Sequence, residues 1–164
     1  FSLFPVAILS SITSFISFTG FILIGSSCTT FWPILAPIVN EIILTDEITS
    51  MSSMFRGCTS LESIQLFDCG NVTNMNSIFD SFYSYNSLTH LGGFKDLKIT
   101  IISGFLEKCP NLTVESLMNV INNVYDLTAN GLSGQSLRFG STNLNKLSEE
   151  QIAIATSKGW TLTA

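Results

Sequence analysis

The side chains that could carry out chemistry are few, and their spacing does not favour catalysis. His90 is the single histidine, so any Ser-His-Asp triad would have to use it, and Asp96 follows six residues later. The Gly-x-Ser-x-Gly nucleophile motif, the P-loop, the Gly-x-Gly-x-x-Gly motif and a carboxylate pair at a catalytic spacing are all absent from the sequence. We therefore expect a protein that is not an enzyme and that uses no cofactor.

The four cysteines could form disulfides or bind a metal. Cys28, Cys58 and Cys109 take equivalent places in a repeated pattern, where a small apolar side chain would pack inside the fold. We favour buried free thiols, and a bridge between Cys58 and Cys69 is the alternative. No metal is expected, because zinc would need a Cys-x-x-Cys pair or a second histidine.

The elements that must position these residues follow from an internal repeat. Residues 48–55 read ITSMSSMF and return 24 residues later as VTNMNSIF at 72–79. The Cys-x-x-Leu of residues 58–61 returns 51 residues later at 109–112. Repeats of this length indicate units that stack on one another and bury a continuous core between them.

Each unit is predicted to hold two parts. A turn of helix rich in Met and Phe, such as residues 50–55, comes first, and a short strand, such as residues 61–66, follows. Because alternate strand residues face opposite ways, we expect Ile64 and Leu66 to point into the stack.

The N-terminal residues 1–47 form a degenerate version of the repeat. Residues 1–40 carry no charge, but Ser, Thr, Gly and Pro interrupt every apolar run before it reaches the roughly 20 residues that span a bilayer. We expect no transmembrane segment. The chain begins inside a repeat, so the apolar N-terminal repeat end is expected to self-associate or to meet another partner.

Residues 113–164 are predicted to form a capping unit of the same domain. Thr113 can cap a helix in which Leu117, Val120, Ile121 and Val124 recur at helical spacing. A strand at 136–139, a helix that begins with a Ser148 to Gln151 capping box and a last strand at 160–163 complete the unit.

The pattern Met-x-x-Met-Phe-x-x-Cys-x-x-Leu, followed by Leu-x-x-Ile-x-Leu and then Asn-Val-Thr-Asn-Met at 71–75, resembles the BspA-like leucine-rich repeat family. The resemblance is specific over residues 48–112. It implies a right-handed α/β solenoid of short strands and short helices, with repeats over residues 1–112 and a C-terminal α/β cap. It also implies a bacterial surface or secreted protein, often an adhesin, while related repeats occur in phage proteins.

A binding surface is expected on the outward strand positions. The net charge is −5 and the seven Lys and Arg residues are scattered, which argues against a nucleic-acid partner. Two tyrosines lie in an inserted loop that is expected to flank the strands. The proposed ligand-binding residues are Ser63, Gln65, Tyr83, Tyr85, His90, Lys98, Thr100 and Arg138.

These residues predict non-catalytic recognition of a glycan or protein through the strand face. The family resemblance implies that the protein lies at the bacterial cell surface or is secreted. The alternative is a structural subunit of a phage particle or larger assembly, in which case the protein would reside in the virion.

Overall fold

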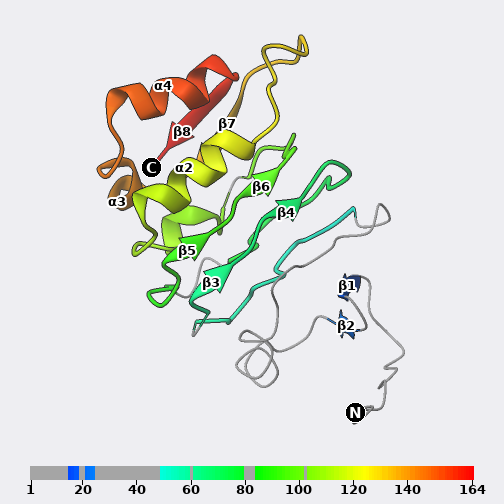
Figure 1. The fold of residues 1–164 in the computed structure, drawn as a ribbon. Coiled ribbons are helices and arrows are strands. Elements are labelled where there is room, and N and C mark those ends of the chain that lie inside the picture. The colour runs from blue at the N-terminus through cyan, green and yellow to red at the C-terminus, as the bar shows by residue number, and fades with distance from the viewer. Residues whose placement is uncertain (1–14, 19–20, 25–48, 60, 80–83, 102) are drawn as a thin grey trace.

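The computed structural model of the chain describes residues 15–18, 21–24, 49–59, 61–79, 84–101 and 103–164. Two N-terminal strands, β1 (Phe15–Phe18) and β2 (Phe21–Ile24), pair antiparallel. From residue 49 onward the strand pairs are parallel (Figure 1). In the described part of the chain, no helix has both the length and the apolar composition needed to cross a membrane.

One ladder of backbone hydrogen bonds runs from residue 50 to the last strand, and we call it the long ladder. Ser50 pairs with Asn74, and Ile101 pairs with Leu137, both parallel. Between these pairs, the Ser77 amide donates to the Ser103 carbonyl at 3.0 Å. The ladder ends where β7 (Gln135–Arg138) pairs parallel with β8 (Trp160–Thr163).

Two shorter strand pairs join the same repeats outside the long ladder. Strand β3 (Ser63–Ile64) pairs with β5 (His90–Leu91), and β4 (Phe67–Asp68) pairs with β6 (Phe94–Lys95) (Figure 1). The chain bends between each strand and the next. A Cβ atom at Gly92 would lie 2.4 Å from the Leu66 nitrogen, so the bend requires glycine there.

The predicted single strand over residues 61–66 is wrong, because the chain bends after Ile64. Ile64 is buried as expected, but Leu66 is 40% exposed, and Phe67 takes the next inward position. Strict alternation would have placed Leu66 inside only if the strand continued straight. Because of this bend, the next side chain to face the core after Ile64 is that of Phe67 and not that of Leu66.

The predicted helical turns are also wrong, because residues 51–57 form turns without an α-helix. Ser53 and Ser77 hold φ angles of 57° and 53°. This left-handed backbone cannot continue a right-handed helix. The two serines occupy the same place in successive repeats, so the turn itself is repeated.

In the described part of the chain, the helices all begin after residue 105. They are the short 3₁₀ helix η1 (Leu106–Lys108), α2 (Val114–Asn123), α3 (Ser141–Leu144) and α4 (Glu149–Ser157). The Thr113 side chain caps α2 by accepting from the Ser116 amide, and Ser148 and Gln151 form the capping box of α4. The predicted elements at 113–123, 149–157 and 160–163 are confirmed.

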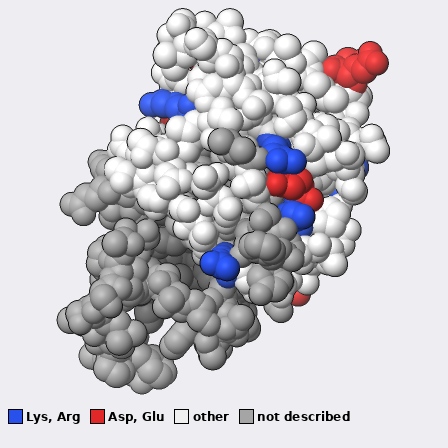
Figure 2. Space-filling view, turned by 180° about the vertical axis from the view of Figure 1, so that it is seen from behind, with Lys and Arg blue, Asp and Glu red and all other residues white. Residues whose placement is uncertain are grey.

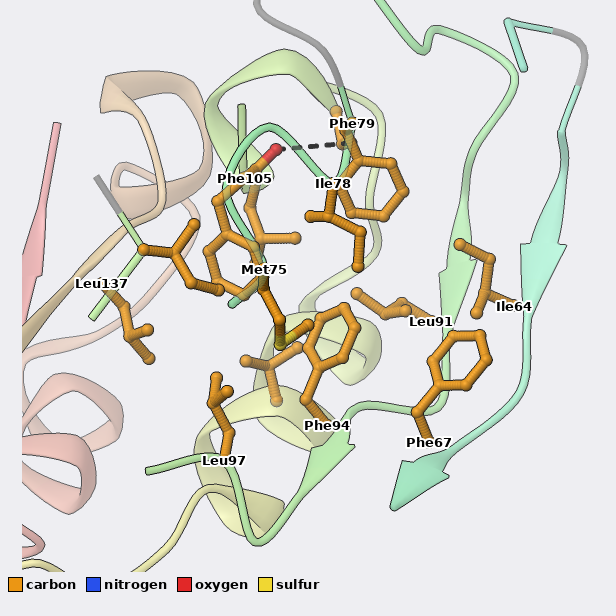
Figure 3. Packing of buried hydrophobic residues seen from close by; sticks show 14 of the residues in the cluster. Ile64, Phe67, Met75, Ile78, Phe79, Leu91, Phe94, Leu97, Phe105 and Leu137 are labelled. Atoms are coloured by element: carbon orange, nitrogen blue, oxygen red, sulfur yellow. Dashed lines mark hydrogen bonds between the residues drawn. The ribbon is translucent and has the colours of Figure 1, made fainter. Parts of the chain in front are cut away.

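Aromatic rings form columns through the core. Phe55 stacks on Phe79 at 5.6 Å between centroids, and Phe67 stacks on Phe94 at 6.0 Å. Phe94 then contacts Phe105 at 5.3 Å (Figure 3), and all five rings are buried. Each unit therefore contributes an aromatic ring that packs on the ring of the next unit.

The cysteines follow the expectation only in part. Cys69 and Cys109 are free and buried, and burial raises the pKa of the Cys69 thiol to about 12. The alternative bridge between Cys58 and Cys69 is therefore absent. Cys58 is disulfide-bonded, which corrects its assignment as a free thiol.

A buried amide joins the cap to the repeats. The Asn143 side chain is 1% exposed, and its Nδ2 atom lies 2.8, 3.2 and 3.0 Å from the carbonyl oxygens of Leu106, Cys109 and Phe139. We expect Asn143→Ala to lower the free energy of unfolding by about 2–3 kcal/mol, because it leaves these buried carbonyls without a donor.

Chemical denaturation measures this loss. The matched control is Asn145→Ala, which removes the same group from an exposed position and should change stability by less than about 0.5 kcal/mol. Equal stabilities of the two variants would contradict the role assigned to Asn143.

Candidate functional site

Polar side chains on β3 and β5 form an exposed surface that we call the strand patch. It comprises Glu62, Ser63, Gln65, Thr89 and His90, of which Thr89 is half-buried and the other four are exposed. Ser63 and His90 are register partners in the parallel pair, and the following residues, Ile64 and Leu91, are buried. The structure thus brings three predicted binding residues, Ser63, Gln65 and His90, onto neighbouring positions of one polar surface.

The backbone beneath the strand patch is held by bonds between repeats. The amides of Thr89 and His90 both donate to the Glu62 carbonyl, at 3.1 and 3.3 Å. Thr89 Oγ1 lies 2.8 Å from His90 Nδ1, which orients the imidazole ring. The second ring nitrogen, Nε2, is then the one available to a ligand.

Lys98 and Thr100 belong to a different group, which we call the loop patch and which also contains Asp68, Lys95, Tyr125 and Gln135. Lys98 Nζ lies 4.7 Å from the centre of the Tyr125 ring and 3.4 Å from the Gly70 carbonyl. Gln135 accepts from Thr100 Oγ1 at 2.7 Å and donates to the Lys98 carbonyl at 2.7 Å. These contacts hold the loop that follows β6.

An ion pair links the two strands that lead into the loop patch. Lys95 Nζ lies 2.8 Å from Asp68 Oδ2 and 3.5 Å from Asp96 Oδ2. The hydrogen bond from Lys95 lowers the pKa of the Asp68 carboxyl, and the same bond raises the pKa of Lys95. Sequence reasoning missed this pair, although Asp68 and Lys95 stand 27 residues apart at equivalent repeat positions.

Tyr85 is corrected from a surface ligand contact to a core residue. Its side chain is fully buried, and its hydroxyl donates to the Phe55 carbonyl at 2.9 Å and accepts from the Gly57 amide at 3.1 Å. The ring also packs edge-on against Phe79. The hydroxyl finds its partners inside the preceding repeat, which draws the ring inward; Tyr83 lies outside the described residues.

Arg138 stands apart from both patches, on β7 in the long ladder. It is exposed, and its Nε atom lies 3.8 Å from a Glu107 oxygen. That carboxylate also accepts from the Gly104 and Phe105 amides. The eight predicted residues therefore do not form a single site, and the strand patch is the largest set that the structure brings together.

Charge does not gather into one dominant area on the face seen in Figure 2. Basic and acidic side chains there occur as separate spots and small mixed groups, on a described surface that is otherwise uncharged. Among the residues that the structure describes, no three His, Cys, Asp or Glu side chains are placed to hold a metal ion. The chemistry available to the strand patch is hydrogen bonding by hydroxyl, amide, imidazole and carboxylate groups.

The chain was compared with protein families, curated proteins and solved structures. The family model described as "Mycoplasma protein of unknown function, DUF285" matches residues 39–133, which includes both patches apart from Gln135. No curated protein and no solved structure matches the chain.

The ion pair between Asp68 and Lys95 should determine the pKa of the Asp68 carboxyl. Lys95→Met should raise the pKa of Asp68, because the carboxylate loses the hydrogen bond that favours its charged form. In the native chain the contribution of Asp68 to stability is present above its unfolded pKa and is lost as the pH falls through its lower folded pKa.

The pKa of Asp68 is measured by NMR titration of its carboxyl carbon in both proteins. Lys108→Met, which removes a lysine that makes no contact with Asp68, should leave the value unchanged. An unaltered Asp68 titration in the Lys95→Met protein would show that the bond is not formed in solution.

Proposed function

The chain belongs to the DUF285 family, and we propose that it is a non-catalytic recognition module whose repeats form a right-handed α/β solenoid of the BspA-like leucine-rich repeat kind. The parallel pairing of residues 24 positions apart, as between Ser50 and Asn74, supports this architecture. The aromatic columns support it further, since they place equivalent rings of successive units against one another.

The observation that carries the recognition function is the alternation of exposed polar and buried apolar side chains along β3 and β5. Ile64 and Leu91 are buried at 3% and 1% exposure, whereas their neighbours Ser63 and His90 face solvent. The backbone between them is fixed by bonds to the adjacent repeat. The strand patch therefore presents polar groups at little cost in conformational entropy, which favours binding of a glycan or a polar protein surface.

Placement at the bacterial surface or in the secreted fraction is part of the same proposal. It rests on the resemblance of the repeats to BspA-like proteins. The strand patch suits that setting because its hydroxyl, amide and imidazole groups match the hydrogen-bonding groups of a carbohydrate.

A structural subunit of a phage particle or larger assembly is the second candidate. The observation that favours it is the last strand, β8, which pairs with β7 on one side only among the described residues. A sheet edge of this kind can dock another polypeptide.

Binding of the purified chain to arrays of glycans and host matrix proteins tests the recognition function. We expect a saturable ligand whose affinity falls at least about tenfold in the triple variant Ser63→Ala/Gln65→Ala/His90→Ala, because each change removes a hydrogen-bonding group from the strand patch. Tyr85 is left intact, since its replacement would open the core.

The matched control is Ser141→Ala/Thr142→Ala/Asn145→Ala, which removes three exposed polar groups from α3 and the turn after it. It should bind like the native chain. Absence of any saturable ligand for the folded protein, or equal binding by both triple variants, would overturn the assignment of the strand patch.

A further inference from the structure

The long ladder ends at an unpaired edge. In parallel pairing, alternate residues direct their N–H and C=O groups to one neighbour or the other. The Gln135 amide donates to the Gly159 carbonyl and the Phe139 amide to the Thr163 carbonyl. These bonds fix the alternation: Gly159, Thr161 and Thr163 face β7, and the N–H and C=O groups of Leu162 point to the opposite side.

No described element pairs with that opposite side. The sheet holds β7 and β8 alone beyond the bridge to Ile101, and β8 lies beside α4, next to the C-terminus (Figure 1). Helices α3 and α4 contact β8, yet no backbone hydrogen bond from them reaches Leu162. The expected C-terminal cap therefore covers the apolar core and leaves the backbone ladder open.

The residue types that usually protect a sheet edge are also absent from residues 160–164. Natural edges are guarded by lysine, proline, bulges or inward-pointing charges. Residues 160–164 read WTLTA, with no charge and no proline. Trp160 is buried and anchored by a 2.8 Å bond from its Nε1 to the Tyr125 carbonyl, so the strand is held firmly in place.

We propose that the open edge of β8 pairs antiparallel with β8 of a second copy of the chain, about a two-fold axis that passes beside Leu162. In this register the N–H and C=O groups of Leu162 bond reciprocally with those of the other Leu162. Trp160 is buried, so the pairing is confined to residues 161–163 of each copy. The exposed Thr161 then stands opposite Thr163, in the close pairing that lacks hydrogen bonds.

Self-complementarity is the reason to assign a second copy as the occupant. An isologous interface requires that the same surface match itself, and opposed like charges would prevent this. Residues 160–164 carry no side-chain charge, and their outward backbone groups repeat symmetrically about Leu162. The inference is independent of the ligand of the strand patch.

Paired charge substitutions test this register. In the variant Thr161→Asp/Thr163→Asp, both cross-strand pairs become like-charged, so we expect the dimer dissociation constant to rise about tenfold. In Thr161→Lys/Thr163→Asp the same pairs become oppositely charged, and dimerisation should match or exceed that of the native chain. Both variants share the Thr163→Asp change, which lies beside Arg138, the register partner of Thr163. Any effect of that change within a single chain is therefore the same in both variants.

Sedimentation equilibrium of the 164-residue chain from micromolar to millimolar concentration provides the readout, with circular dichroism to verify folding. A native chain that stays monomeric throughout would overturn the proposal. So would a dimer that responds equally to both variants, which would place the contact elsewhere, for instance at the N-terminal repeat end. Growth of open-ended oligomers in place of a dimer would also overturn it, because two-fold pairing closes.

Discussion

The structure from residue 49 onward depends on hydrogen bonds between segments that lie more than twenty residues apart in sequence. Strands of two residues, such as β3 and β4, cannot persist alone, and their backbone groups find partners only in the next repeat. The Phe columns reinforce this, because each ring is covered by the ring of its neighbour. Local structure is therefore a consequence of stacking, and a unit removed from the stack would lose both its bonds and its apolar cover.

The need of backbone groups for distant hydrogen-bond partners also explains how the cap is attached. Where the repeats end, lysine side chains of the cap donate hydrogen bonds to backbone carbonyl groups of the preceding segments. Lys146 Nζ donates to the Pro110 and Leu112 carbonyls, and Lys158 Nζ donates to the Ile121 and Asn122 carbonyls near the end of α2. Burial lowers the pKa of both ammonium groups, and the carbonyl oxygens offset part of the lost hydration. A positive charge at the C-terminus of α2 also complements its dipole.

Sequence reasoning succeeded where the signal was local or strictly periodic. The Thr113 cap, the Ser148 capping box and the last strand depend on a few adjacent residues, and all three were predicted. It failed where one residue's position depended on a distant partner. Leu66 faces solvent because the chain bends after Ile64, where Gly92 of the next repeat packs against the Leu66 backbone. Tyr85 turns inward to reach the Phe55 carbonyl 30 residues away. Neither partner is visible in the local pattern, so the sequence alone places Tyr85, an aromatic residue beside an insertion, on the surface.

The two surfaces inferred for this chain lie on different strand pairs, and their separation would affect how the protein binds. The strand patch lies on β3 and β5, outside the long ladder, whereas the open edge belongs to β8 at the end of that ladder (Figure 1). Two-fold pairing through β8 would leave both strand patches uncovered and hold them apart in one particle. A module with a modest affinity for a repeated glycan or protein surface would then bind through two sites at once. The second contact would gain from a high effective concentration without any new interaction in the site itself.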